Sequence, residues 1–140
     1  MNLLWESGEY GVLTFLFLTL ALGGAAATAT GRALALTWRP WWQCILYAAP
    51  LALAIAFLHY AIFEEPAISI EAITEQVASA DNSAAVAGAI AWNMRGWAVL
   101  FVLFAAFSLA GFRVTRVFQM TRQYRFAYAA SGLFGWRKIS

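Results

Sequence analysis

Three long runs of the chain contain only apolar and uncharged polar residues. No Asp, Glu, Lys or Arg occurs in residues 10–31, 40–63 or 96–112. A helix needs about 20 mostly apolar residues to cross the hydrocarbon layer of a bilayer, and arginines that flank a shorter run can extend their charged groups to the membrane surface. The pattern therefore predicts an all-α membrane protein with three transmembrane helices, at about 10–31, 41–63 and 96–118.

The segment between the second and third runs, residues 64–95, has a different periodicity. Ile70, Ile73 and Val77 recur at helical spacing, and glutamates fall between them. This pattern predicts a short amphipathic helix that lies on a membrane surface or on a partner. Residues 81–83, Asp-Asn-Ser, predict a turn with a helix N-cap, followed by a second helical stretch.

The composition supports a membrane protein. The 140-residue chain is 63% hydrophobic and 11% charged, whereas soluble domains average about 45–50% apolar and about 25% charged residues. We expect residues 1–140 to form a single membrane domain, with a tail at 119–140. The single Cys44 cannot form a disulfide within the chain.

The two signs of charge occupy different segments. All acidic residues precede the first run or lie between the second and third. The basic residues, with the exception of Arg95, lie in the bend between the first two runs or after the third run. Because basic loops stay on the cytoplasmic side of a membrane, we expect the N-terminus and residues 64–95 outside, the C-terminus in the cytoplasm, and a multi-pass protein of the inner membrane.

The bend between the first two runs, "GRALALTWRPWWQ", concentrates arginine and tryptophan. Both residue types are typical of the membrane–water boundary, where they fix the ends of helices. We interpret five residues as anchors at this boundary: Arg32, Trp38, Arg39, Trp41 and Trp42.

Small residues form one face of the first predicted helix. Gly23, Ala27 and Gly31 recur every four residues, and such a face lets a second helix approach closely. The spacing predicts a helix-packing interface. It leaves open whether the second helix belongs to this chain or to a partner subunit.

His59 is the only histidine and lies inside the second run. A histidine in a membrane can ligate a haem or a pigment metal, or hydrogen-bond to Glu64 or a neighbouring helix. We favour the hydrogen bond. Because no spacing typical of catalytic residues, metal ligands or a phosphate loop occurs, we expect no enzyme and no cofactor, with bound lipid as the expected ligand.

The tail combines arginines with aromatic residues, and its pattern predicts that the third helix continues beyond the membrane. Such a surface can bind anionic lipid or dock on another protein, and the sequence leaves both open. Nucleic acid is not an expected partner, since no folded basic domain is present. The candidate docking residues are Arg116, Arg122, Tyr124, Arg125, Tyr128 and Trp136.

Four stretches resemble a known family: "TGRALALTWRPWWQCILY", "FLHYAIFE", "GFRVTRVFQMTRQY" and "FGWRK". The chain is similar to small bacterial inner-membrane proteins of unknown function with three predicted spans. Genes of that family often lie beside those for branched-chain amino acid ABC transporters. The resemblance implies an accessory subunit.

These observations favour a non-catalytic accessory or stabilising subunit of a multisubunit inner-membrane complex. The resemblance makes a branched-chain amino acid ABC transporter the favoured host. One alternative is a small peripheral subunit of a respiratory or photosynthetic complex. Another is a self-associating small transporter or channel, which the lack of central charge in the apolar runs disfavours.

Overall fold

A computed structural model describes residues 13, 15–63 and 70–139, and this part of the chain is mostly helical. A π-helix, η1 (Phe15–Gly23), leads directly into α2 (Gly24–Leu36). The remaining elements are α3 (Trp42–Phe63), α4 (Ile70–Ala78), α5 (Ser83–Gln123), β1 (Tyr128–Ala130) and β2 (Trp136–Lys138).

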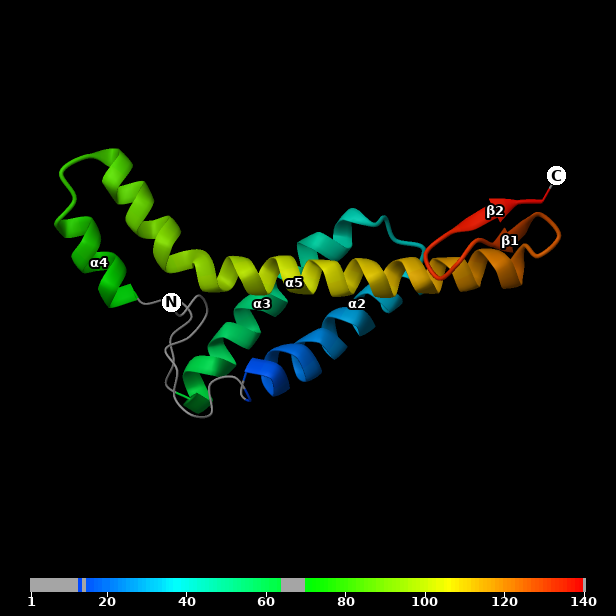
Figure 1. Cartoon of the computed structure of the whole chain (residues 1–140), viewed down its shortest axis with the longest axis horizontal. Helices are drawn as coiled ribbons and strands as arrows, with labels where there is room; N and C mark the ends of the chain where they lie inside the picture. The colour runs from blue at the N-terminus through cyan, green and yellow to red at the C-terminus, as the bar shows by residue number, and fades with distance from the viewer. Residues whose placement is uncertain (1–12, 14, 64–69, 140) are drawn as a thin grey trace.

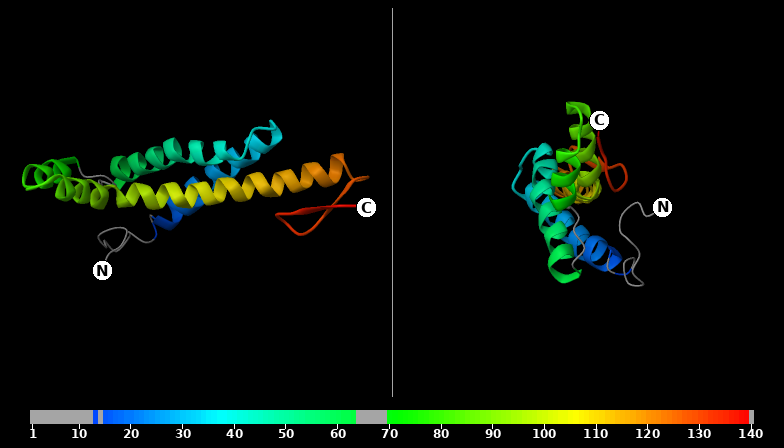
Figure 2. Two further views of the ribbon diagram at one scale, coloured as in Figure 1. Left: turned by 90° about the horizontal axis from the view of Figure 1, so that it is seen from above. Right: turned by 90° about the vertical axis from the view of Figure 1, so that its left-hand side faces the viewer.

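Helix α5 organises the molecule. It has 41 residues, which corresponds to a length of roughly 60 Å at 1.5 Å per residue. Helices α2 and α3 cross its middle, α4 lies at its N-terminal end, and the β1–β2 hairpin lies beside its C-terminal end (Figure 1). In the view from above in Figure 2, α3 lies along one side of α5, which it crosses obliquely in the view of Figure 1.

Two of the described helices are long and apolar enough to cross a membrane, within Trp42–His59 and Met94–Gln123. Only 33% and 28% of these windows are buried, whereas the core helix of a soluble protein is mostly buried. Large apolar side chains such as Leu53, Phe57 and Val102 are exposed on them, and contiguous apolar surface of this kind marks contact with lipid or with another protein. The first predicted span, 10–31, begins at positions outside the described residues, and its described part forms η1 and most of α2.

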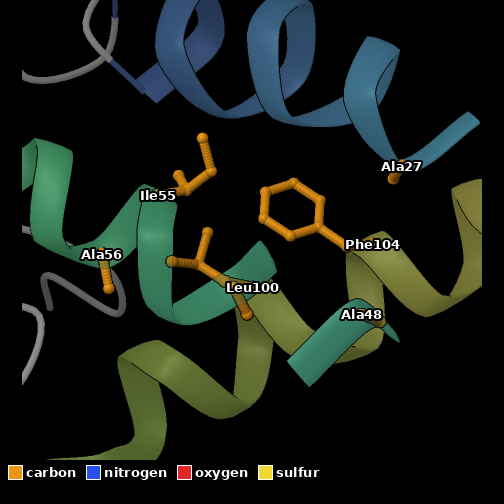
Figure 3. Close-up of a cluster of buried hydrophobic side chains, with 7 residues drawn as sticks. Ala27, Ala48, Ile55, Ala56, Leu100 and Phe104 are labelled. Atoms are coloured by element: carbon orange, nitrogen blue, oxygen red, sulfur yellow. The ribbon is translucent and has the colours of Figure 1, made fainter. Parts of the chain in front are cut away.

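The largest core cluster lies where α2 and α3 meet α5. The Phe104 ring of α5 is fully buried and points between Ile55 of α3 and Ala27 of α2, with Leu100 one turn before it (Figure 3). The α3 residues that face this cluster include small alanines, which let the helices approach closely. The three helices therefore share one core centred on a single aromatic ring.

Helices α2 and α5 touch through their backbones. A Cβ added to Gly31 would overlap the carbonyl group of Ser108, and one added to Gly111 would lie 2.5 Å from the carbonyl oxygen of Thr28. Near the start of α2, Gly23 meets the ring of Phe104. Residues later in the first helix contact residues later in α5: Gly23 meets Phe104, whereas Gly31 meets Ser108. Helices α2 and α5 therefore run in the same direction.

The segment 64–95 contains the helices that its pattern predicts. The amphipathic stretch forms α4, and α5 begins at Ser83. The Asn82 side chain accepts a hydrogen bond from the backbone N–H of Ala85 at 2.8 Å, which confirms the predicted N-cap. Residues 64–69, including Glu64, lie outside the described residues.

The prediction of an all-α fold omitted a β-hairpin in the tail. Strands β1 and β2 pair in antiparallel register, with Ala129 opposite Arg137. The connecting loop is closed by a hydrogen bond from the Ser131 N–H to the Gly135 carbonyl at 2.9 Å, and Gly132 has a φ of +94°. A positive φ favours glycine, which explains why the chain reverses here. Helical periodicity did not reveal this turn because the strands have only three residues each.

Candidate functional site

The bend between α2 and α3 begins with a tryptophan in an unusual backbone conformation. Trp38 has a φ of +58° and is the only non-glycine residue of the described chain with a positive φ. Its N–H donates to the Ala35 carbonyl at 3.1 Å, and the Arg39 N–H donates to the Leu34 carbonyl at 3.0 Å. These two bonds form the Schellman motif, whose left-handed position is usually glycine. A left-handed tryptophan costs roughly 1–2 kcal/mol, and residues in sparsely populated conformations often occur at functional sites.

Arg116 of α5 holds this bend in place. Its guanidinium carbon lies 4.2 Å from the centroid of the Trp38 ring and 5.3 Å from that of Phe112. Its Nη2 group also donates to the Arg39 carbonyl at 3.4 Å. A guanidinium over an aromatic face is attracted by the negative face of the ring. One side chain thus connects α5 to both residues at the centre of the bend.

The hairpin adds a third tryptophan to this region. Trp136 of β2, together with Trp38, Trp41, Phe112, Arg113 and Arg116, lines a cavity of about 590 Å³, to which Leu109 and Met120 also contribute. We call the six named residues the Trp–Arg cluster. They come from three segments that are distant in sequence: the bend, α5 and the hairpin.

The charge of the cluster is not neutralised within the described chain. Nη1 of Arg116 is buried and has no hydrogen-bond partner among the described residues. The acidic residues of the described chain, Glu71, Glu75 and Asp81, belong to α4 and the turn that follows it. They lie at the opposite end of α5 from the hairpin (Figure 1). The cluster can therefore accept an acidic group from outside the described chain.

The five predicted boundary anchors separate into different environments. Trp41 and Trp42 are both exposed, but only Trp41 lines the cavity of the cluster. Arg39 contributes its backbone carbonyl to Arg116. Arg32 is exposed and lines a second groove, between α2 and α5.

The predicted docking residues of the tail do not form one surface. Arg116 and Trp136 belong to the cluster, whereas Arg122 lines the second groove and stacks 5.6 Å from the Phe118 ring. Tyr124 ends α5, with its ring edge-on to Phe126 at 6.3 Å. Tyr128 lies in β1, and Arg125 is exposed between the helix and the strand.

His59 is fully buried between helices. Its Nε2 atom lies 3.0 Å from the Thr19 hydroxyl of η1. The sequence favoured a hydrogen bond to Glu64 or to a neighbouring helix, and the contact with Thr19 is of the second kind. No group of three or more His, Cys, Asp or Glu side chains gathers in the described part of the chain.

The small-residue face of the first helix is covered by this chain's own α5. Gly23, Ala27 and Gly31 are all buried, and α5 supplies Phe104 and Ser108 opposite the two glycines. The sequence had left a partner subunit as the other possible neighbour. In the structure this face has no room for one.

Several residues that build these contacts were not singled out by sequence reasoning. Ser108 and Gly111 provide the backbone approach to α2, and their spacing of three in an apolar helix was the available signal. Phe112 and Arg116, four residues apart, share one helix face, which places the ring beside the guanidinium.

A family model described as "Domain of unknown function (DUF6867)" matches residues 10–81 and 82–139. The chain belongs to this family. The matched residues include every member of the Trp–Arg cluster and the glycines of the α2–α5 contact. No curated protein and no solved structure matches the chain.

Proposed function

We propose that this protein is a bacterial inner-membrane protein with three spans, with its N-terminus outside and its C-terminus in the cytoplasm. The α2–α5 contact supports this arrangement, because the first and third spans of a three-span protein must run in the same direction. The placement of basic residues in the bend and after the third span supports the orientation. The Trp–Arg cluster then lies at the cytoplasmic surface.

Reporter fusions test the orientation. A reporter that is active only in the cytoplasm should work when fused after Ser140 and fail when inserted beside Asn82, in the exposed turn before α5. Activity at Asn82 without activity at Ser140 would reverse the proposed orientation. Activity at both positions would contradict a membrane span within α5, the only helix between the two fusion sites among the described residues.

Within that membrane, we propose that the protein is a non-catalytic accessory subunit of a larger complex. The observation that carries the proposal is the Trp–Arg cluster, where the exposed Trp38 and Trp41 lie beside Arg116, whose buried Nη1 atom has no hydrogen-bond partner among the described residues. Tryptophan and arginine are the residue types most enriched among the energetically dominant residues of protein interfaces. The proposed mechanism is that an acidic segment of the host docks on this cluster and stabilises the assembled complex.

The favoured host is a branched-chain amino acid ABC transporter, and this choice rests on the family resemblance in sequence. The contact surface is reassigned from the small-residue face to the Trp–Arg cluster, because α5 already covers the small-residue face. The exposed apolar side chains of α3, such as Leu46 and Leu53, would face lipid or the membrane part of the host.

Purification from the native membrane tests this function. The full chain with a C-terminal tag is solubilised in mild detergent, and the proteins that co-purify are identified by mass spectrometry. Transporter permeases and ATPases in a fixed ratio to this chain are the expected result. Pigmented or redox subunits would instead support the respiratory or photosynthetic alternative, and recovery of the chain alone would favour self-association.

A pair of adjacent tryptophans provides a matched control for the docking surface. Trp41→Ala removes an exposed ring that lines the cavity, and Trp42→Ala removes an exposed ring that does not. The Trp41 variant should lose most of the co-purifying host, and the Trp42 variant should retain it. Equal retention by both variants would exclude the cluster as the contact surface even if the host itself is identified correctly.

A further inference from the structure

A second groove, of about 450 Å³, lies between the C-terminal end of α2 and the last turns of α5. It is lined by a different set of α5 residues from the Trp–Arg cluster. Leu36, Val114 and Phe118 are its apolar residues, and its polar residues are Arg32, Thr115, Gln119, Arg122 and Gln123. The groove therefore offers hydrogen bonds and an apolar surface side by side.

Two guanidinium groups from different helices line this groove. Arg32 lies on α2, and Arg122 lies on α5 with its guanidinium stacked on the Phe118 ring. The acidic residues of the described chain belong to α4 and the following turn, so none of them lies at this end of α5 (Figure 1). Two such cations favour an anion with several acceptor oxygens, and guanidinium groups bind phosphate especially well.

Gln119 adds a requirement of the opposite kind. Gln119 is only 9% exposed, and its side-chain carbonyl oxygen Oε1 is buried without a hydrogen-bond partner among the described residues. A buried acceptor without a donor is costly, and native proteins normally satisfy it. A ligand that completes this groove therefore carries a hydrogen-bond donor close to its anionic group.

We propose that this groove binds the headgroup of an anionic phospholipid. The guanidinium groups of Arg32 and Arg122 bind the phosphate oxygens, and Gln119 accepts a hydrogen bond from a headgroup hydroxyl. The apolar residues contact the lipid beyond the phosphate. Arg32 directly follows the first predicted span, which places the groove at headgroup level. The site rests on the membrane placement proposed above and does not depend on the identity of the host.

The charge requirement is tested by native mass spectrometry of the delipidated full chain, titrated with phosphatidylglycerol. Arg122→Gln should weaken binding about tenfold or more, because hydrogen bonds to charged groups contribute more than neutral ones. Arg125→Gln is the matched control. It removes the same charge three residues away, from an exposed position that lines neither this groove nor the cavity of the Trp–Arg cluster. Equal losses in the two variants would show general attraction to anionic lipid and would overturn the site.

The donor requirement is tested with two lipids of equal charge. Phosphatidylglycerol carries headgroup hydroxyls, whereas phosphatidylmethanol carries the same phosphodiester without them. The wild-type chain should bind phosphatidylglycerol severalfold more tightly, and Gln119→Met, which is similar in size, should abolish this preference. Equal binding of the two lipids by the wild-type chain would exclude the assigned role of Gln119.

The source of the phosphate is tested with glycerol 3-phosphate. Because it lacks acyl chains, it should bind the same protein at least a hundredfold more weakly than phosphatidylglycerol. Comparable affinities would assign the groove to a soluble phosphate compound and overturn the lipid assignment. These measurements need no host protein, so their failure is distinguishable from failure of the accessory-subunit proposal, which only co-purification tests.

Discussion

The glycine contact at Gly31 and the Trp–Arg cluster share helix α5, where Ser108 of the first and Arg116 of the second lie about two turns apart. At Gly31, α2 meets the backbone of Ser108 so closely that even a methyl group would overlap it. In the cluster, the same α5 presents Arg116 with a buried nitrogen that has no described partner, beneath tryptophans that remain exposed. The first contact is completed within the described chain, whereas the described chain leaves Nη1 of Arg116 without a hydrogen-bond partner.

This difference shows which surface is available to a partner. Small-residue stripes are typical of association between membrane helices, because close packing favours assembly in lipid. Here that packing is already used to join α2 to α5. A partner is therefore better sought at the Trp–Arg cluster, where two tryptophans are exposed and Nη1 of Arg116 lacks a hydrogen-bond partner among the described residues.

The largest effect is expected from filling the glycine contact. Gly31→Ala places a methyl group against the Ser108 carbonyl, a backbone atom that cannot move away as the end of a side chain can. We expect a loss of about 2–3 kcal/mol in the free energy of unfolding, in the upper part of the range for overpacking. Thermal and denaturant unfolding in detergent, followed by tryptophan fluorescence, measures this change.

Gly24→Ala is the control for this substitution. It lies on the same helix, but its added Cβ would meet the Phe107 ring at 3.5 Å, an ordinary van der Waals distance. Its stability should change by less than about 1 kcal/mol, the difference in helix propensity between glycine and alanine. Equal losses at both positions would mean that α2 and α5 do not touch backbone to backbone, and the first side of the comparison would fail.

The sequence predicted the helices better than the contacts between them. Uncharged runs located α3 and the apolar part of α5, because each needs only local composition and length. A helix N-cap was predicted within residues 81–83, because a cap involves a residue only three positions away, as the bond between Asn82 and Ala85 does. Local spacing also identified Gly31 as an interface residue. It could not identify the neighbour of Gly31, because that depends on which distant helix packs against it in the fold.

The candidate site was only partly predictable for the same reason. Tryptophan and arginine in the bend were recognised as boundary residues, yet Arg116 is 77 positions from the carbonyl to which it donates. Trp136 reaches the cluster only because a hairpin, rather than a helix, reverses the chain around Gly132. Periodicity in the sequence does not predict contacts between residues that lie so far apart along the chain.

An intermediate effect is expected from removing the cation that holds the bend. Arg116→Gln removes the charge over the Trp38 ring and weakens the link to the Arg39 carbonyl. The expected loss is about 1–2 kcal/mol, the contribution of a partly desolvated cation–π contact. The same unfolding measurement applies. Arg113→Gln is the control, since it also lines the cavity and removes one positive charge, and it should cost less than about 0.5 kcal/mol.

If Arg113→Gln costs as much as Arg116→Gln, net charge rather than the contact with Trp38 accounts for stability at this end of the molecule. The co-purification measurement then separates stability from docking. A variant that keeps the wild-type free energy of unfolding but no longer co-purifies with the host would show that the substituted residue of the cluster contacts the host.

The smallest effect tests the backbone of the bend itself. Trp38→Gly and Trp38→Ala both remove the ring from Arg116, but only glycine adopts a φ near +58° without strain. The glycine variant should therefore be more stable than the alanine variant by about 1 kcal/mol. In an ordinary helical position the order is the reverse, since alanine is favoured there by about 1 kcal/mol. A glycine variant that is more stable than the alanine variant would show that the bend keeps its left-handed turn without the tryptophan. The ring would then serve its contacts with Arg116 and the cavity. An alanine variant at least as stable as the glycine variant would mean that the left-handed turn depends on the Trp38 ring. The cluster would then be a contact completed within the chain, as the glycine contact is.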